Sequence, residues 1–199
     1  MTLLRFLDIL GFVVGLVYLW LEYKASIWLW LAGVVMPLVD MFLYFKAGLY
    51  ADFGMAVYYC LAGVYGFVVW KFCGKKLAAG ESGVVESGKG IAHFARRLIV
   101  PTVAVALLLW LGIWWILVTF TDSSVPVADA FTTALSIVAL WALSRKYAEQ
   151  WLLWLVVDFV CCALYVYKGI PFKAAIYGIY SVVAVLGYRK WLRLIPRNA

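Results

Sequence analysis

The sequence predicts an all-α membrane protein with seven transmembrane helices. Hydrophobic residues make up 67% of its 199 residues and charged residues only 14%, whereas soluble domains contain about 25% charged residues. The apolar residues gather in blocks long enough to cross the roughly 30 Å hydrocarbon core of a bilayer. This composition excludes an ordinary soluble globule, because too little polar surface would remain to cover it.

Seven apolar blocks, each bounded by charged or turn residues, define the expected helices. In chain order they are Phe6–Leu21, Ile27–Phe45, Phe53–Phe72, Leu98–Phe120, Val125–Leu143, Trp151–Tyr167 and Ala174–Tyr188. No small-residue cleavage site follows the first block, so we expect a retained helix rather than a signal peptide. The fourth block carries no charge and is the clearest span. Several other blocks are short, so their helices are expected to extend into flanking residues.

The distribution of basic residues predicts the orientation, because cytoplasmic loops are rich in lysine and arginine. The side that holds the N-terminus carries Arg5, Lys46, Lys168 and Lys173. The opposite side carries the other 13 basic residues, among them Arg96, Arg97, Arg145 and Lys146. We therefore expect the N-terminus outside and the C-terminus in the cytoplasm of a bacterial inner membrane. The net charge of +7 then reflects topology and contact with membrane lipid rather than nucleic acid.

The two halves of the chain resemble each other at an offset of 121 to 123 residues, as expected of a transporter built from repeats. The matching pairs are Trp20 and Trp141, Lys24 and Arg145, Tyr44 and Tyr167, Lys46 and Lys168, Gly66 and Gly187, and Trp70 and Trp191. Two three-helix units face the same way only if one helix separates them. The sequence thus predicts a three-plus-one-plus-three parallel repeat: a first unit (1–73), a cytoplasmic loop (74–97), a linker helix (98–120) and a second unit (121–199). Chance similarity between aromatic-rich helices is the alternative.

Ionisable side chains inside a membrane are costly and face a cavity or a partner, so Asp40 and Asp158 are candidates for substrate binding. Trp151, Trp154, Asp158 and Tyr165 follow helical spacing and share one face of the sixth block. Indole rings, a phenol and a carboxylate on one face suit a flat cation. An aromatic packing seam, with Asp158 tied to another helix, is the alternative that spacing leaves open.

Tyrosines of the third and seventh blocks are expected to line a central path between the repeats. They are Tyr58, Tyr59, Tyr65 and Tyr180. Because tyrosines also fill helix interfaces, packing is the alternative.

Five further residues are expected to have structural or gating roles. They are Glu22, Glu149, Trp70, Gly66 and Gly187. Glu22 and Glu149 lie near basic residues at roughly similar places, just before or at the start of the second helix of each unit. A charge pair or cap that fixes helix ends, or a gating contact, would explain them.

The sequence contains no P-loop, no nucleophile–histidine arrangement and no cluster of metal-ligand spacing. It therefore predicts neither an enzyme nor a cofactor or metal site, and its four cysteines are expected to be apolar structural thiols.

The segment from Arg145 to Gly169 resembles the signature of the Pnu family of bacterial vitamin transporters. Its Arg-Lys-Tyr-Ala-Glu-Gln-Trp-Leu-Leu-Trp run continues through Asp158 to Tyr-Val-Tyr-Lys-Gly. The third block, with Tyr65, Gly66 and Trp70, resembles the family's Tyr-Gly-Trp-x-x-Trp ending, although Phe67 replaces the first Trp. The resemblance covers essentially the whole chain. It implies a fold related to the SWEET sugar transporters, often trimeric, and facilitated diffusion by alternating access, with the vitamin trapped by cytoplasmic phosphorylation.

The resemblance also bears on the substrate. Family members that carry nicotinamide riboside typically have Gln and Asn in the third span and Asn in the sixth, where this chain has Ala56, Gly63 and Asp158. The segments Gly33–Pro37 and Ala47–Gly54 instead resemble the thiamine-transporting branch. The resemblance thus implies thiamine, with nicotinamide riboside or riboflavin as alternatives. A membrane scaffold that transports nothing is an alternative of a different class.

Overall fold

The computed structural model describes residues 3–47, 50–73, 90–121, 125–167, 169 and 171–195, including most of their side chains. The chain divides into two compact units, Met1–Lys75 and Lys76–Ala199. Most of the expected cytoplasmic loop, residues 74 to 89, lies outside the described residues.

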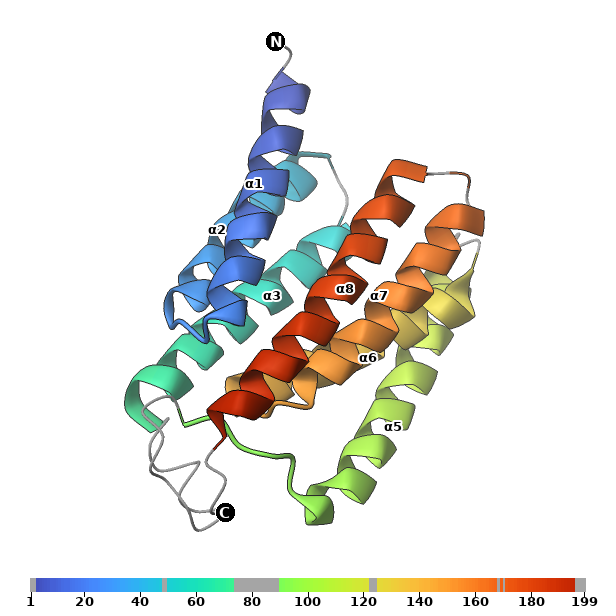
Figure 1. Cartoon of the computed structure of the whole chain (residues 1–199). Coiled ribbons are helices and arrows are strands. Elements are labelled where there is room, and N and C mark those ends of the chain that lie inside the picture. Colours follow the sequence, from blue (N-terminus) through green and yellow to red (C-terminus); the bar gives the residue numbers. More distant parts are fainter. Residues whose placement is uncertain are drawn as a thin grey trace. The chain divides into compact units, whose positions relative to one another are not determined.

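The first unit contains three α-helices in its described residues (Figure 1). They are α1 (Leu3–Tyr23), α2 (Trp28–Ala47) and α3 (Tyr50–Val68), and α3 continues into a π-helical turn, η1 (Val69–Cys73). Helix α2 packs against both α1 and α3. Side chains of α2 lie directly against two glycines of α3, since a Cβ at Gly63 would lie 2.4 Å from Val34 and one at Gly66 would lie 2.4 Å from Trp30.

The second unit contains four helices in its described residues (Figure 1). They are α5 (Arg96–Phe120), α6 (Pro126–Ser144), α7 (Gln150–Tyr167) and α8 (Pro171–Leu194). Helix α6 packs against α5 and α7, and α7 packs against α8. None of the residues of α5 is buried within the chain, whereas α6 buries small residues such as Ala130, Ala134 and Ala139. Helix α5 therefore presents apolar surface to its surroundings.

The expected apolar blocks are helical wherever the structure describes them. Among the described residues, four helical segments are long and apolar enough to span a bilayer: Phe53–Phe72, Arg96–Phe120, Pro126–Ser144 and Gln150–Tyr167. Two shorter apolar segments, Val13–Tyr23 and Trp28–Val39, accompany them. Helix α8 continues six residues beyond the expected end at Tyr188, into a basic segment. The number of seven spans stays a prediction.

The turn between the first two helices of each three-helix set has the same backbone geometry in both units. Ala25 and Lys146, which lie 121 residues apart, have left-handed φ angles of 50° and 58°. The backbone hydrogen bonds that close the turns also match: Lys24 N to Trp20 O (3.1 Å) and Arg145 N to Trp141 O (3.2 Å), Ser26 N to Leu21 O (2.9 Å) and Tyr147 N to Ala142 O (3.0 Å).

A second repeated feature, here called the tryptophan–glycine contact, joins the last two helices of each set. It consists of Trp30, Gly66 and Trp70 in the first unit and Trp151, Gly187 and Trp191 in the second. The indole rings meet edge to face in both, with centroids 5.7 and 5.9 Å apart and interplanar angles of 85° and 86°. A Cβ at Gly66 or Gly187 would lie 2.4 or 2.6 Å from the neighbouring indole. Only glycine therefore permits this approach.

Candidate functional site

A carboxylate and three tyrosines meet where α7 packs against α8. Asp158 is buried, with 7% of its surface exposed. Tyr165 of α7 stacks on Tyr177 of α8, with ring centroids 5.3 Å apart and an interplanar angle of 17°. Tyr180 meets Tyr177 edge to face at 5.8 Å. Asp158 interacts electrostatically with Tyr177 and Tyr180. We call these four residues the Asp158–tyrosine cluster.

Two polar side chains here, Asp158 and its neighbour Trp154, have no hydrogen-bond partner among the described residues. Among the described residues, none donates a hydrogen bond to the Asp158 carboxylate. Trp154 lies one turn earlier on the same helix face, and its buried Nε1 has no acceptor in the described part of the chain. Unpaired polar groups are costly in an apolar interior. The site therefore offers a hydrogen-bond acceptor and a donor beside aromatic faces, which suits a flat ring with polar substituents.

Trp151, which was predicted to bind substrate together with Trp154, Asp158 and Tyr165, lies in a packed helix contact instead. It is only 1% exposed and belongs to the tryptophan–glycine contact between α7 and α8. The stripe therefore divides along the helix: Trp151 packs, whereas Asp158 and Tyr165 lie in the cluster. Trp70, Gly66 and Gly187, expected to have structural or gating roles, lie in the same type of contact.

The candidate tyrosines of the first unit are more accessible. Tyr58 and Tyr59 meet edge to face at 5.5 Å, and Tyr59 and Tyr65 are 37% and 47% exposed. Tyr59 corresponds to Tyr180 of the second unit at the offset of 121 residues. The side chain of Asp40, the other candidate carboxylate, lies outside the described residues.

Ala56 and Gly63 stand in α3 where the resemblance to the nicotinamide riboside carriers places Gln and Asn. A Cβ at Gly63 would lie 2.4 Å from Cγ2 of Val34, and Ala56 is 4% exposed. A larger residue at position 63 would therefore require Val34 or its helix to shift.

Glu22 and Glu149, expected at roughly similar places, lie at different points relative to the two matching turns. Glu22 lies in the last turn of α1 and is 1% exposed, whereas Glu149 lies in the turn before α7. At the offset that matches the two turns, Glu22 corresponds to Leu143. The sequence comparison placed them together because both glutamates lie near basic residues between two apolar blocks.

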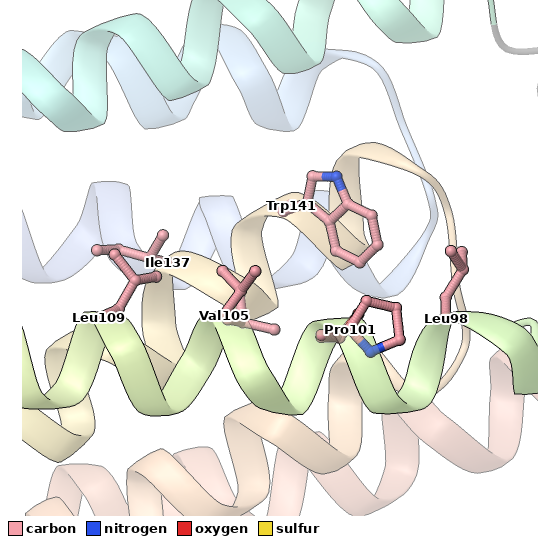
Figure 2. Close-up of a pocket in the computed structure, with 8 residues that line it drawn as sticks. Leu98, Pro101, Val105, Leu109, Ile137 and Trp141 are labelled. Carbon is pink, nitrogen blue, oxygen red and sulfur yellow. The ribbon is translucent and has the colours of Figure 1, made fainter.

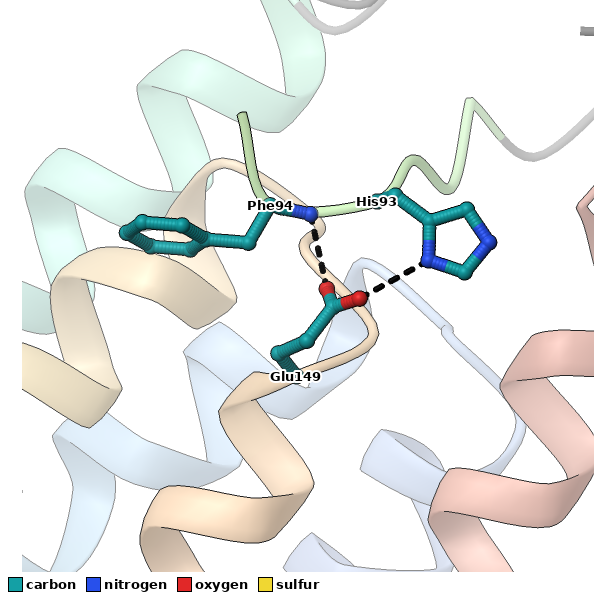
Figure 3. Close-up of polar contacts among 3 residues, drawn as sticks. All are labelled: His93, Phe94 and Glu149. Carbon is teal, nitrogen blue, oxygen red and sulfur yellow. Dashed lines mark hydrogen bonds and ion pairs between the residues drawn. The ribbon is translucent and has the colours of Figure 1, made fainter. Parts of the chain in front are cut away.

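Glu149 fastens the segment before α5 to the α6–α7 turn (Figure 3). Its Oε1 lies 2.8 Å from Nδ1 of His93, and the backbone N–H of Phe94 donates to Oε2 at 2.8 Å. The ring of Phe94 packs against Tyr147 at 4.9 Å, and Ala92 pairs with Tyr147 as a β-bridge. We call this contact the Glu149 clasp. Sequence reasoning gave His93 no role, because its partner is 56 residues away.

Apolar helices long enough to span a bilayer and a buried carboxylate among aromatic rings define a polytopic membrane protein with the features of a small-solute carrier. Residues 5–193 match the model of the nicotinamide mononucleotide transporter family. The chain therefore belongs to this family of membrane vitamin transporters, and it is a transporter rather than an enzyme. The resemblance to the Pnu family is confirmed.

Named relatives extend over most of the chain. It is 32% identical over 191 residues to the riboflavin/roseoflavin transporter RibM of Streptomyces davaonensis, covering 92% of this chain and 83% of RibM. It is 22% identical over 208 residues to the nicotinamide riboside transporter PnuC of Escherichia coli, covering 95% and 86%. Thiamine appears in neither name.

The crystal structure of the vitamin B3 transporter PnuC has a similar fold. It matches with a TM-score of 0.67 and 21% identity, over 94% of this chain and 80% of that one. The similarity indicates a common helical architecture.

Proposed function

We propose that this protein carries riboflavin across the bacterial cytoplasmic membrane by facilitated diffusion. The observation that carries the proposal is the 32% identity to a riboflavin transporter over 92% of the chain, compared with 22% to the nicotinamide riboside transporter of Escherichia coli. The chain holds no nucleotide-binding motif, so uptake becomes one-way when phosphorylation in the cytoplasm removes the free vitamin.

The chemistry of the Asp158–tyrosine cluster suits riboflavin. The flat, uncharged isoalloxazine ring can stack on the faces of Tyr165 and Tyr177, which already lie parallel. The hydroxyl groups of the ribityl chain can donate to the Asp158 carboxylate, a hydrogen bond strengthened by the charge. The ring carbonyls can accept from Nε1 of Trp154. The substrate-binding role expected of Tyr58, Tyr59 and Tyr65 in the first unit stays a prediction.

The proposed transport cycle rests on the repeat. Two parallel three-helix units, separated by α5, would expose a site near the middle of the membrane alternately to either side. The matching turns and the two tryptophan–glycine contacts support this division. We further propose seven spans, an external N-terminus, a cytoplasmic C-terminus and a trimeric assembly.

Uptake by cells that cannot synthesise riboflavin tests the proposal. Expression of the chain should allow saturable uptake of labelled riboflavin, and excess unlabelled riboflavin should abolish it. An equal excess of thiamine or nicotinamide riboside should leave uptake nearly unchanged. Uptake of labelled thiamine or nicotinamide riboside, with no uptake of riboflavin, would refute the assignment.

Nicotinamide riboside is the second candidate, because PnuC also aligns over nearly the whole chain. The absence of the amides at Ala56 and Gly63 weighs against it. Thiamine, the substrate that the branch-specific segments imply, stays a prediction. It would require the Asp158 carboxylate to pair with the thiazolium cation, and the competition assay separates all three vitamins.

A further inference from the structure

An apolar groove runs between α5 and α6, away from the Asp158–tyrosine cluster. Its volume is about 390 Å³. Figure 2 shows Leu98, Pro101, Val105 and Leu109 along α5, facing Trp141 and Ile137 of α6. Because α5 buries none of its residues within the chain, the groove lies on an apolar surface suited to the bilayer. Its lining can take a hydrocarbon chain without leaving polar groups unpaired.

At one end of this groove, an arginine lies one helical turn beyond a lining residue of each wall. Arg97 lies four residues before Pro101, and Arg145 lies four residues after Trp141. Residues four apart share a helix face, so both arginines continue the walls of the groove. Helix α5 begins at this end of the groove and α6 ends there, so Arg97 and Arg145 lie at the same end. Arg97 is exposed, and the buried Nε of Arg145 has no hydrogen-bond partner among the described residues.

The first turn of α5 also favours an anion. It contains Arg96 and Arg97 but no acidic residue, and its N-cap Ala95 supplies no side-chain hydrogen bond. The Glu149 carboxylate, which accepts from the N–H of Phe94 at 2.8 Å, already lies just before this turn. Arg96 and Arg97 place two positive charges at the positive end of the helix dipole, where a further anion is favourable. In the neighbouring turn, burial lowers the pKa of Lys146, which makes that side chain a poorer partner for an anion. Arginine also matches the geometry of phosphate oxygens.

We propose that this groove binds one anionic phospholipid, with an acyl chain along the groove and the phosphate between Arg97 and Arg145. The predicted topology places this end at the cytoplasmic leaflet, whose negative surface attracts basic residues. The lipid fills the space between α5 and α6 and compensates the charge at the start of α5. The proposal does not depend on which vitamin is carried.

The test uses the purified full-length chain in a neutral detergent. Native mass spectrometry would compare phosphatidylglycerol with phosphatidylcholine of identical acyl chains. Phosphatidylglycerol should bind at least tenfold more tightly and raise the melting temperature. The double variant Arg97→Gln with Arg145→Gln should lose this preference. Arg189→Gln with Arg193→Gln removes two exposed arginines from α8 in the same unit and should retain it.

Three further variants keep the test decisive. Val105→Trp, which fills the groove, should weaken binding of both lipids. If the glutamine variant does not fold, Arg97→Lys with Arg145→Lys keeps both charges and should preserve most of the preference. Equal binding of the two lipids, or preference retained in a folded glutamine variant, would overturn the proposal. Efficient disulfide dimers of Val105→Cys in native membranes would also overturn it, because a second copy would then occupy the groove.

Discussion

Asp158 combines burial, a membrane-spanning helix and the absence of a hydrogen-bond donor among the described residues. A carboxylate in such surroundings destabilises the folded protein unless something compensates it. Stacked tyrosines and the Nε1 of Trp154 surround it, so the missing partner is best explained as part of a flat substrate.

Replacing Asp158 with asparagine should lower the rate of riboflavin uptake at subsaturating concentration by about tenfold or more, because a charged hydrogen bond is worth about 1.5–3 kcal/mol. Initial rates in proteoliposomes measure this effect. Asp129→Asn is the control, since Asp129 lies in the first turn of α6, where an acidic residue favours the helix start. Equal rates in the two variants would exclude Asp158 from substrate binding.

Tyr177 contributes a ring face more than a hydroxyl group. Tyr177→Phe should therefore stay within about threefold of the wild-type KM for riboflavin, whereas Tyr177→Ala should raise it about tenfold, as expected for loss of a stacking contact of about 1 kcal/mol together with its buried area. Tyr167→Ala removes a tyrosine that is 80% exposed and should change little. A KM for Tyr177→Ala equal to that of wild type would contradict stacking on this ring.

At the scale of helices, the tryptophan–glycine contacts fix how closely neighbouring elements approach. Trp30 and Trp151 are 2% and 1% exposed and are held by Trp70 and Trp191, so their rings have little room to move. The two contacts therefore set the distances between α2 and α3 and between α7 and α8.

Gly66→Ala and Gly187→Ala should each destabilise the protein by about 1–3 kcal/mol, because the added methyl group overpacks the contact. Gly54→Ala and Gly178→Ala are matched controls on the same two helices, since nothing lies within 4 Å of a Cβ at either position. The controls should be neutral or stabilising, as alanine favours helix by about 1 kcal/mol. Melting in detergent distinguishes the pairs, and similar losses in all four variants would contradict the contact.

The Glu149 clasp connects the start of α5 to the α6–α7 turn. Glu149→Ala should increase amide hydrogen exchange at Phe94 by about tenfold or more, because a hydrogen bond to a carboxylate is lost. His93→Ala leaves that backbone bond intact and should cause a smaller increase. Unchanged exchange at Phe94 in Glu149→Ala would show that the aromatic contact with Tyr147 alone holds the segment.

At the scale of the whole molecule, the positions of the helices could be predicted because they depend on local sequence. The helices follow the apolar blocks within a few residues, because bilayer thickness sets their length and charged residues end them. The similarity between the two halves was visible in Trp20 and Trp141, whereas the matching left-handed φ angles of Ala25 and Lys146 required backbone geometry.

Features that depend on tertiary packing were not predictable. Helical spacing placed Trp151 and Asp158 on one face of the helix. It could not show that Trp151 packs against Gly187, or that α8 brings Tyr177 near Asp158. The pairing of His93 with Glu149 joins distant segments and leaves no local signal. The substrate depends on the combined shape of several helices, which explains why motif resemblance and the named relatives favour different vitamins.

Binding of riboflavin to the purified protein tests the central claim most directly. Flavin fluorescence is quenched by stacked aromatic side chains, so a titration reports the proposed contact itself. The account predicts saturable quenching with one riboflavin per chain, at least tenfold weaker in Asp158→Asn, and no displacement by thiamine. Absence of saturable quenching by a folded, monodisperse protein, or displacement of riboflavin by equimolar thiamine, would contradict it.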